Sequence, residues 1–215
     1  MKHLIAIPVL AIASCGMMNA SILFSLGNHP QPDEVNVLLK SGTTGTLVTG
    51  APKGFPGMTV DFTSTQLLAE PASGQARVSA DPEGTPLTNL TIALASGDYG
   101  DLIMNPFIGG CRQCLGGTAT ITVNSVDQFG NPEAASTFIY DLANGNNFLT
   151  IVASGGERIT STSIDNPGGF NDLRQPRISG LGTAPTPEPG TYMLLVAGLA
   201  LMAVGGRRRF RTAPR

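Results

Sequence analysis

Apolar and polar residues alternate along most of the chain between residues 21 and 180. Apolar side chains recur at every second position, with Thr, Ser, Asn, Asp, Gln or Arg between them. The clearest sets are Val35, Val37 and Leu39; Met58, Val60 and Phe62; Ala76, Val78 and Ala80; Leu90, Ile92 and Leu94; and Ala119, Ile121 and Val123. A period of two is typical of strands with one buried and one wet face, and no helical period is sustained in this span. The pattern predicts an all-β domain.

Turn residues lie where the alternating stretches break. Asn144-Gly145 separates residues 137–142 from residues 147–152, and Asn-Gly is a strong signal for a two-residue hairpin turn. Gly155-Gly156 marks the next break, and residues 129–132 (Phe-Gly-Asn-Pro) close an earlier predicted hairpin. The turns therefore predict short, sequentially paired strands.

Many short strands with turn residues at the breaks indicate a single antiparallel β-sandwich over residues 21–180, of Ig-like or jelly-roll type. The alternation also predicts which side chains point into the sandwich. We expect an interior that includes Leu90, Ile92, Ile121, Val123 and Phe148.

Residues 1–20 have the composition of a secretory signal peptide. Lys2 supplies the positive start, residues 4–13 form an apolar core, and cleavage is expected after Ala20. The alternative is a lipoprotein signal, because residues 12–15 (Ile-Ala-Ser-Cys) are similar to a lipobox in which Cys15 would receive the lipid. The apolar core before Cys15 is short, so we predict an ordinary signal peptide.

The C-terminal end contains three parts in order. Pro187-Glu188-Pro189 comes first, an uncharged apolar run over residues 192–204 follows, and a basic cluster ends the series (Arg207, Arg208, Arg209 and Arg211). The prolines keep the motif extended ahead of the helix that the apolar run predicts, and the arginines hold the C-terminus in the cytoplasm. A helix over residues 191–206 would span about 24 Å at ~1.5 Å per residue, short of the ~30 Å hydrocarbon core. The tail is therefore a marginal anchor.

This order of parts resembles the PEP-CTERM sorting signal of exopolysaccharide-associated bacterial surface proteins. The resemblance implies recognition by exosortase, a membrane-embedded cysteine transpeptidase, and removal of the tail near Pro187-Glu188-Pro189. The mature protein would then have no transmembrane helix, whereas a plain single-pass tail anchor, the alternative, would keep it.

The chain is thus expected to have four parts. These are a signal peptide (1–20), a β-sandwich domain (21–180), a Pro-rich linker with the Pro-Glu-Pro motif (181–189), and a sorting segment with its short transmembrane helix and arginine cluster (190–215).

Charge excludes one class of partner. Residues 21–190 contain seven Lys or Arg and all fifteen Asp or Glu, so this span has a net charge of −8. An acidic domain is repelled by phosphate backbones, and we expect no nucleic acid partner.

Candidate catalytic residues are few. The chain has two histidines, His3 in the signal and His29 near the mature N-terminus. A Ser/His/Asp or Cys/His catalytic site would therefore depend on His29 alone, which lies in a Pro-rich loop. Two cysteines and one distant histidine are too few ligands for zinc, and no Gly-rich phosphate loop opens a helix. We expect no catalytic residues, no metal and no cofactor.

Four carboxylates lie in predicted loops: Asp98, Asp101, Asp165 and Asp172. A pair of them could serve glycoside hydrolysis, and one loop could hold calcium. Sugar sites usually also present stacking aromatics, and this chain has no Trp and three Tyr. We interpret the four as solvated loop carboxylates and keep a carbohydrate-binding module or carbohydrate-active enzyme as the alternative function.

The remaining candidate motif is a Cys-x-x-Cys sequence, Cys111-Arg112-Gln113-Cys114. A redox Cys-x-x-Cys is followed by a helix, whereas here Leu115-Gly116-Gly117 and a predicted strand follow. Removal of the signal leaves these two as the only cysteines in an oxidising compartment. We predict a local Cys111–Cys114 disulfide that fixes one turn.

Together these features predict an exported, non-enzymatic protein of the cell surface or extracellular matrix, structural or adhesive in role and associated with exopolysaccharide. Its expected partners are an exosortase-type transpeptidase, extracellular polysaccharide and, before processing, the inner membrane through the C-terminal helix.

Overall fold

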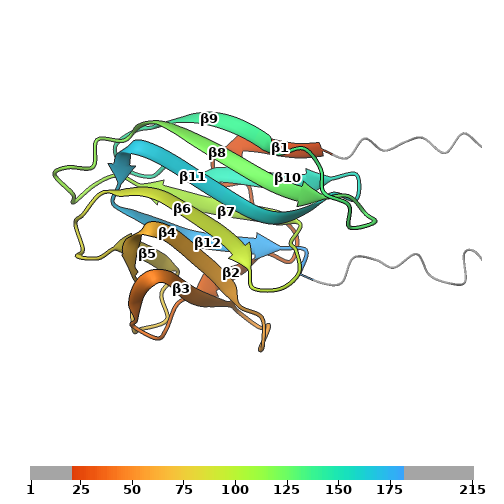
Figure 1. The fold of residues 1–215 in the computed structure, drawn as a ribbon, viewed down its shortest axis with the longest axis horizontal. Coiled ribbons are helices and arrows are strands. Elements are labelled where there is room, and N and C mark those ends of the chain that lie inside the picture. Colours follow the sequence, from red (N-terminus) through yellow and green to blue (C-terminus); the bar gives the residue numbers. More distant parts are fainter. Residues whose placement is uncertain (1–20, 182–215) are drawn as a thin grey trace, which may run out of the picture. The chain divides into compact units, whose positions relative to one another are not determined.

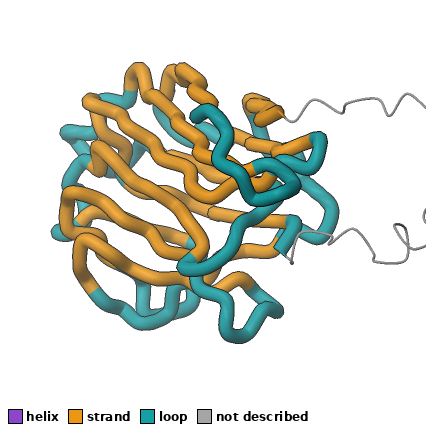
Figure 2. The backbone as a smooth tube through the Cα atoms, turned by 45° about the vertical axis from the view of Figure 1, so that its right-hand side comes forward, coloured by secondary structure: helices purple, strands orange, loops and turns teal. Residues whose placement is uncertain are grey.

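The structure is a computed structural model that describes residues 21–181, and all of its regular elements are strands (Figure 2). The predicted signal peptide, the rest of the linker, the Pro-Glu-Pro motif, the predicted C-terminal helix and the arginine cluster fall on residues 1–20 and 182–215, outside the described part. Over residues 21–181 there is no helix with the length and apolar character needed to cross a membrane.

Twelve strands form within the described residues. They are β1 (Ser21–Leu26), β2 (Val35–Leu38), β3 (Thr44–Pro52), β4 (Val60–Ala69), β5 (Arg77–Ala80), β6 (Leu87–Leu94), β7 (Asp101–Phe107), β8 (Gly117–Val126), β9 (Ser136–Leu142), β10 (Leu149–Ser154), β11 (Arg158–Phe170) and β12 (Asp172–Ser179).

The strands follow one continuous hydrogen-bonded path, β1-β10-β7-β12-β2-β3-β4-β6-β11-β8-β9. Every neighbouring pair on it is antiparallel. The path folds over into two layers, with β10, β7 and β12 in one and β8, β11 and β6 in the other (Figure 1). The prediction of an all-β, antiparallel domain is therefore confirmed.

Short elements close the two sides of this folded sheet. At one side β5 pairs with both β12 and β4 and so bridges distant parts of the path. At the other side the path ends in β1 and β9, where the rings of Phe24 and Phe138 stack with centroids 5.1 Å apart. Aromatic stacking thus joins two edges that share no strand pairing.

The core lies between the two layers and is made of the apolar positions that alternate along the strands. Leu90, Ile92, Ile121 and Val123 are fully buried, as predicted. Phe148 was expected beside them, and this prediction is wrong because Phe148 is only half-buried. The cause is Asn147, whose buried side chain donates to the carbonyls of Ala143 and Pro106 and so turns inward. The alternation that follows buries Leu149 and Ile151 instead.

One predicted turn is confirmed and another is wrong. Residues 129–132 lie in the loop between β8 and β9, which pair as a hairpin. Asn144-Gly145 does not connect a hairpin, because β9 pairs with β8 whereas β10 pairs with β1 and β7. Gly145 instead forms an isolated bridge with Ile108. Its left-handed backbone (φ 98°) therefore lies in the connection by which the chain passes from β9 in one layer to β10 in the other. The break at Gly155-Gly156 likewise connects β10 to β11, which pairs with β6 and β8.

Candidate functional site

The first half of β12 lies between β5 and β7 and places charged side chains on one face of the sheet. Asp172 is opposite Ser79 of β5 and Phe107 of β7, and Arg174 is opposite Arg77 of β5. The residue between them, Leu173, is fully buried on the core side. Because side chains of a strand alternate, Asp172, Arg174 and Arg77 share the face away from the core.

Two like-charged arginines can lie opposite each other here because a carboxylate lies between them. The Asp172 side chain is fully buried and accepts hydrogen bonds from Arg77 Nε at 2.6 Å and Arg174 Nε at 2.7 Å. Arg174 Nη2 and Asn171 Nδ2 also donate to it, each at 3.2 Å. Both carboxylate oxygens are therefore engaged. The interpretation of Asp172 as a solvated loop carboxylate is wrong, because the two guanidinium groups cover it.

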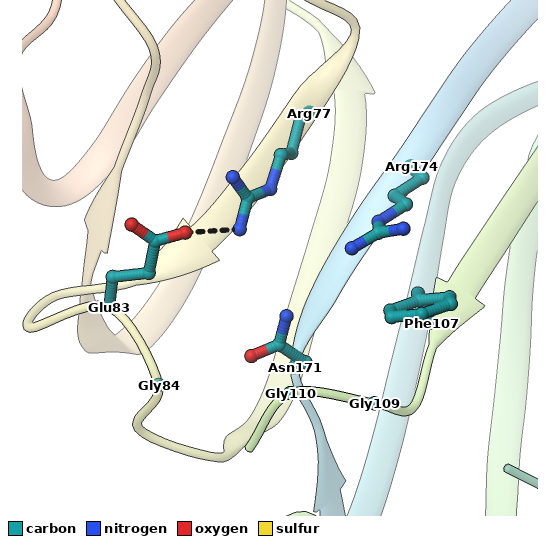
Figure 3. Close-up of a pocket in the computed structure, with 8 residues that line it drawn as sticks. All are labelled: Arg77, Glu83, Gly84, Phe107, Gly109, Gly110, Asn171 and Arg174. Carbon is teal, nitrogen blue, oxygen red and sulfur yellow. Dashed lines mark hydrogen bonds and ion pairs between the residues drawn. The ribbon is translucent and has the colours of Figure 1, made fainter. Parts of the chain in front are cut away.

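Arg77, Arg174 and Asn171 open onto a cavity of about 540 Å³. Arg77 also pairs with Glu83 of the β5–β6 loop, and the Arg174 guanidinium carbon lies 3.4 Å from the centre of the Phe107 ring. Figure 3 shows these side chains around a common space, with Gly84, Gly109 and Gly110 at its rim. The hydrogen bonds and the ring contact hold both guanidinium groups in place.

A second cavity, of about 290 Å³, shares Arg77 and Glu83 with the first. Its lining comprises Ala69, Glu70, Pro71, Arg77, Ser79, Asp81 and Glu83. Glu70 is only 6% exposed, and its Oε1 accepts from the hydroxyl of Thr43 at 2.9 Å and from the Thr43 backbone N–H at 3.3 Å. Its Oε2 is buried and has no hydrogen-bond partner within the described residues.

The other carboxylates of the predicted set do not converge with Asp172 in either cavity. Asp98 accepts from Arg158 Nε at 2.7 Å, and Asp165 is an exposed residue of β11. Asp101 begins β7, where burial raises the pKa of its carboxyl and a hydrogen bond from the Ser179 hydroxyl opposes that rise. In the described span, residues 21–181, no three His, Cys, Asp or Glu side chains are grouped to hold a metal ion.

His29 occupies a structural position in the loop after β1. Its Nε2 lies 2.8 Å from the carbonyl oxygen of Leu26, and its backbone N–H donates to Thr150 Oγ1 at 3.1 Å. Among the residues that the structure describes, no serine or aspartate side chain is hydrogen-bonded to the imidazole.

The Cys111 and Cys114 sulfur atoms are 2.19 Å apart, at disulfide-bonding distance, and both side chains are buried. The loop that they close rests on the end of β11, where the Leu115 N–H donates to the Gly168 carbonyl at 2.8 Å. A Cβ atom on Gly168 would lie 2.0 Å from the Gly116 carbonyl oxygen, so only glycine permits this contact. The cysteine pair therefore shapes the turn beside Gly109 and Gly110, at the rim of the larger cavity.

Replacing Cys111 and Cys114 together by serine is expected to leave the fold intact and to lower the melting temperature by about 3–8 °C. The closed loop is short, so its entropic contribution is below the ~3 kcal/mol of a 15-residue loop, and two buried hydroxyls add a modest cost. In exported wild-type protein, thiol labelling without reductant should modify neither cysteine. Full labelling of both would contradict the prediction.

Sequence reasoning identified Asp172 as a candidate but missed Glu70, Glu83 and Phe107. These residues come from the ends of β4 and β7 and from a loop, and no local motif connects them. Only the strand order brings them to one face.

Residues 185–209 match the PEP-CTERM protein-sorting motif. The match includes Pro187-Glu188-Pro189 and three of the predicted arginines, so the prediction of this sorting signal is confirmed. The motif indicates an exported protein that is processed at the membrane, and it implies processing by an exosortase.

No curated protein matches the chain. Among solved structures, two mutants of CBM29-2, a family 29 carbohydrate-binding module, are similar at 11% and 12% identity, each with a TM-score of 0.27. The alignments cover 78% and 80% of this chain and 99% of each module. The enzymatically active domain of tailspike protein 4 from bacteriophage CBA120 is similar at 15% identity and a TM-score of 0.17, over 77% of this chain and 18% of that one.

Proposed function

We propose that this chain is a non-enzymatic component of the cell surface or extracellular matrix, sorted by exosortase through its C-terminal tail and associated with exopolysaccharide. The observation that carries the proposal is the PEP-CTERM sorting motif at residues 185–209. A globular, all-β domain precedes the motif, so the part of the protein that sorting would bring to the surface is a folded domain.

The sequence order gives the topology that such processing needs. The signal peptide over residues 1–20 directs the domain outward, and the arginine cluster keeps the C-terminus inside. Pro187-Glu188-Pro189 would then lie where the inner membrane meets water on its outward-facing side. There it would be an extended segment open to a membrane-embedded protease. The short apolar run holds the chain only until the tail is removed.

The geometry of the charged face supports a binding or structural role over catalysis. A glycosidase needs one carboxyl group free to give a proton and a second free to act as base or nucleophile. Asp172 accepts four hydrogen bonds and is fully covered, and Glu83 is paired with Arg77. The carboxylates of Asp172 and Glu83 are thus engaged, and a carbohydrate-active enzyme at the larger cavity would have to use them.

Cell fractionation tests the proposal. In cells that contain exosortase, the protein should be recovered from the surface or matrix fraction, and deletion of exosortase should shift it to the inner membrane. Recovery from the cytoplasm, or from the inner membrane in both strains, would overturn the proposal.

A further inference from the structure

The two arginines of the larger cavity keep hydrogen-bond donors that the fold does not use. Arg174 holds Asp172 through Nε and Nη2, so its Nη1 has no partner among the described residues. Arg77 gives Nε to Asp172 and Nη2 to Glu83, and its Nη1 is likewise without a partner within residues 21–181. Neither Nη1 atom is buried, and the side chains of Arg174 and Arg77 are 36% and 29% exposed. A ligand can therefore reach both guanidinium groups.

These unused donors determine the chemistry of the ligand. A guanidinium group donates hydrogen bonds and accepts none, and its paired N–H groups match the two oxygens of a carboxylate. Arg174 uses the Nε–Nη2 edge of its guanidinium group on Asp172, which leaves the Nη1–Nη2 edge for a second carboxylate. The Phe107 ring, whose centre is 3.4 Å from the guanidinium carbon, holds the group in place (Figure 3). The cavity is therefore prepared for an acceptor with two oxygens.

Glu83 shows that a carboxylate can bind at this place. Its side chain is 67% exposed, and among the described residues its carboxylate is bonded to Arg77 alone. Exposed ion pairs are weak, so a ligand carboxylate replaces Glu83 at little cost. The turn that carries Glu83 is closed by a hydrogen bond of 3.1 Å from the Thr85 N–H to the Pro82 carbonyl, so only the side chain has to move.

Exchange of one carboxylate for another also preserves the charge balance of the cavity. The two arginines carry two positive charges, and Asp172 and Glu83 carry two negative ones. A carboxylate added to this set would leave an excess negative charge, whereas one that replaces Glu83 keeps the set neutral. The net charge of −8 over residues 21–190 repels an acidic polymer at long range, but salt screens this repulsion beyond a Debye length of about 8 Å. The contacts inside the cavity therefore decide which ligand binds.

We propose that the larger cavity binds a carboxylate-bearing sugar unit of an acidic polysaccharide. The ligand carboxylate accepts hydrogen bonds from the Nη1–Nη2 edge of Arg174 and from Arg77, and it displaces the Glu83 side chain into water. Asp172 holds both arginines before the ligand arrives, which lowers the ordering cost of binding. Asp172 also stays covered, so release of Glu83 does not create the pair of free carboxyl groups that glycoside hydrolysis needs.

This inference rests on the proposed function, because it names the chemistry of the matrix polymer with which the protein would associate. The test uses full-length protein purified in mild detergent from membranes of cells that lack exosortase, so binding does not depend on sorting. The probe is the acidic fraction of the extracellular polysaccharide of the cells that make the protein, isolated by anion exchange after protease treatment. Its matched control is the same material after carbodiimide and borohydride have reduced its carboxyl groups to alcohols.

Wild type should bind the acidic polysaccharide, and reduction of the carboxyl groups should weaken binding about tenfold or more, because charge-assisted hydrogen bonds are lost. Arg174→Gln should weaken binding of the unreduced polysaccharide to a similar extent. Its control is Lys53→Gln, which removes the same charge from an exposed position in the β3–β4 loop and should bind as wild type does.

Glu83→Gln should change the affinity in the opposite direction. Binding of the acidic polysaccharide should become about two- to fivefold tighter, because the competing carboxylate is gone while the size of the side chain is kept. The matched control is Glu133→Gln, at an exposed position in the β8–β9 loop, which should bind as wild type does. A gain in affinity cannot result from loss of the fold.

Thermal unfolding shows which variants are folded, and if Arg174→Gln is not, Glu83→Gln and the reduced polysaccharide decide the question. The inference is overturned by equal binding of the original and the reduced polysaccharide, by no binding of the acidic fraction, or by unchanged or weaker binding of Glu83→Gln. Correct sorting without binding of the acidic polysaccharide would refute this inference alone. Binding without sorting would refute the proposed function alone.

Discussion

Replacing Asp172 by Asn is expected to lower the free energy of unfolding by about 2–4 kcal/mol. The variant keeps the shape of the side chain but removes the only carboxylate that bonds both Arg77 and Arg174 within the described residues. The new amide nitrogen would face guanidinium donors, and the two arginines would lie opposite each other without compensation. The arginine side chains are 29% and 36% exposed, so water offsets part of the loss, and the range is set below that of a fully buried pair.

Equilibrium denaturation of the purified protein measures this effect. The denaturant concentration at the unfolding midpoint should fall. The slope of the unfolding free energy against denaturant concentration should stay the same, because the surface exposed on unfolding does not change. Asp165→Asn, at an exposed position of β11, is the matched control and should remain within about 0.5 kcal/mol of wild type. A similarly small change for Asp172→Asn would mean that the buried carboxylate does not hold the arginines.

Replacing Glu188 by Ala is expected to convert most of the processed protein into a full-length, membrane-bound form in cells that contain the sorting enzyme. Export and insertion should not change, because the predicted signal peptide, the apolar run and the arginines are untouched. Only recognition of the Pro-Glu-Pro motif should be lost. Immunoblotting of membrane and matrix fractions measures the two forms.

The control is Thr183→Ala, which lies in the linker before the matched motif and should be processed as wild type is. The same distribution for Glu188→Ala and wild type, with the tail attached in both, would show that the segment is only an anchor.

The strands were largely predictable because burial of one face imposes a period of two on the residues themselves. Leu90, Ile92, Ile121 and Val123 follow that period and are buried. The order of the strands was not predictable, since partners such as β1 and β10 are more than a hundred residues apart. Asn144-Gly145 has the chemistry of a hairpin turn, yet the bridge to Ile108 shows that long-range pairing decides what the turn connects. Phe148 was placed wrongly because a polar residue, Asn147, is buried. The alternation that starts from it then buries the odd-numbered positions at the start of β10.

The candidate site was less predictable than the fold. Asp172 and Asp165 are both carboxylates in polar stretches, but β5 and β7 flank Asp172 and bring Arg77 over it. The unpartnered oxygen of Glu70 depends on packing around the end of β4, which no local pattern encodes. The sorting motif, in contrast, was recognised from sequence because its parts follow one another in order along the chain.

One mass measurement decides whether the tail is a processing signal. Intact mass spectrometry of the protein from the surface or matrix fraction of exosortase-containing cells reports both mature ends. We expect a chain that begins near residue 21 and ends close to Pro187-Glu188-Pro189, without the arginine cluster. A mass that still includes residues 190–215 would contradict exosortase sorting and leave a plain membrane anchor.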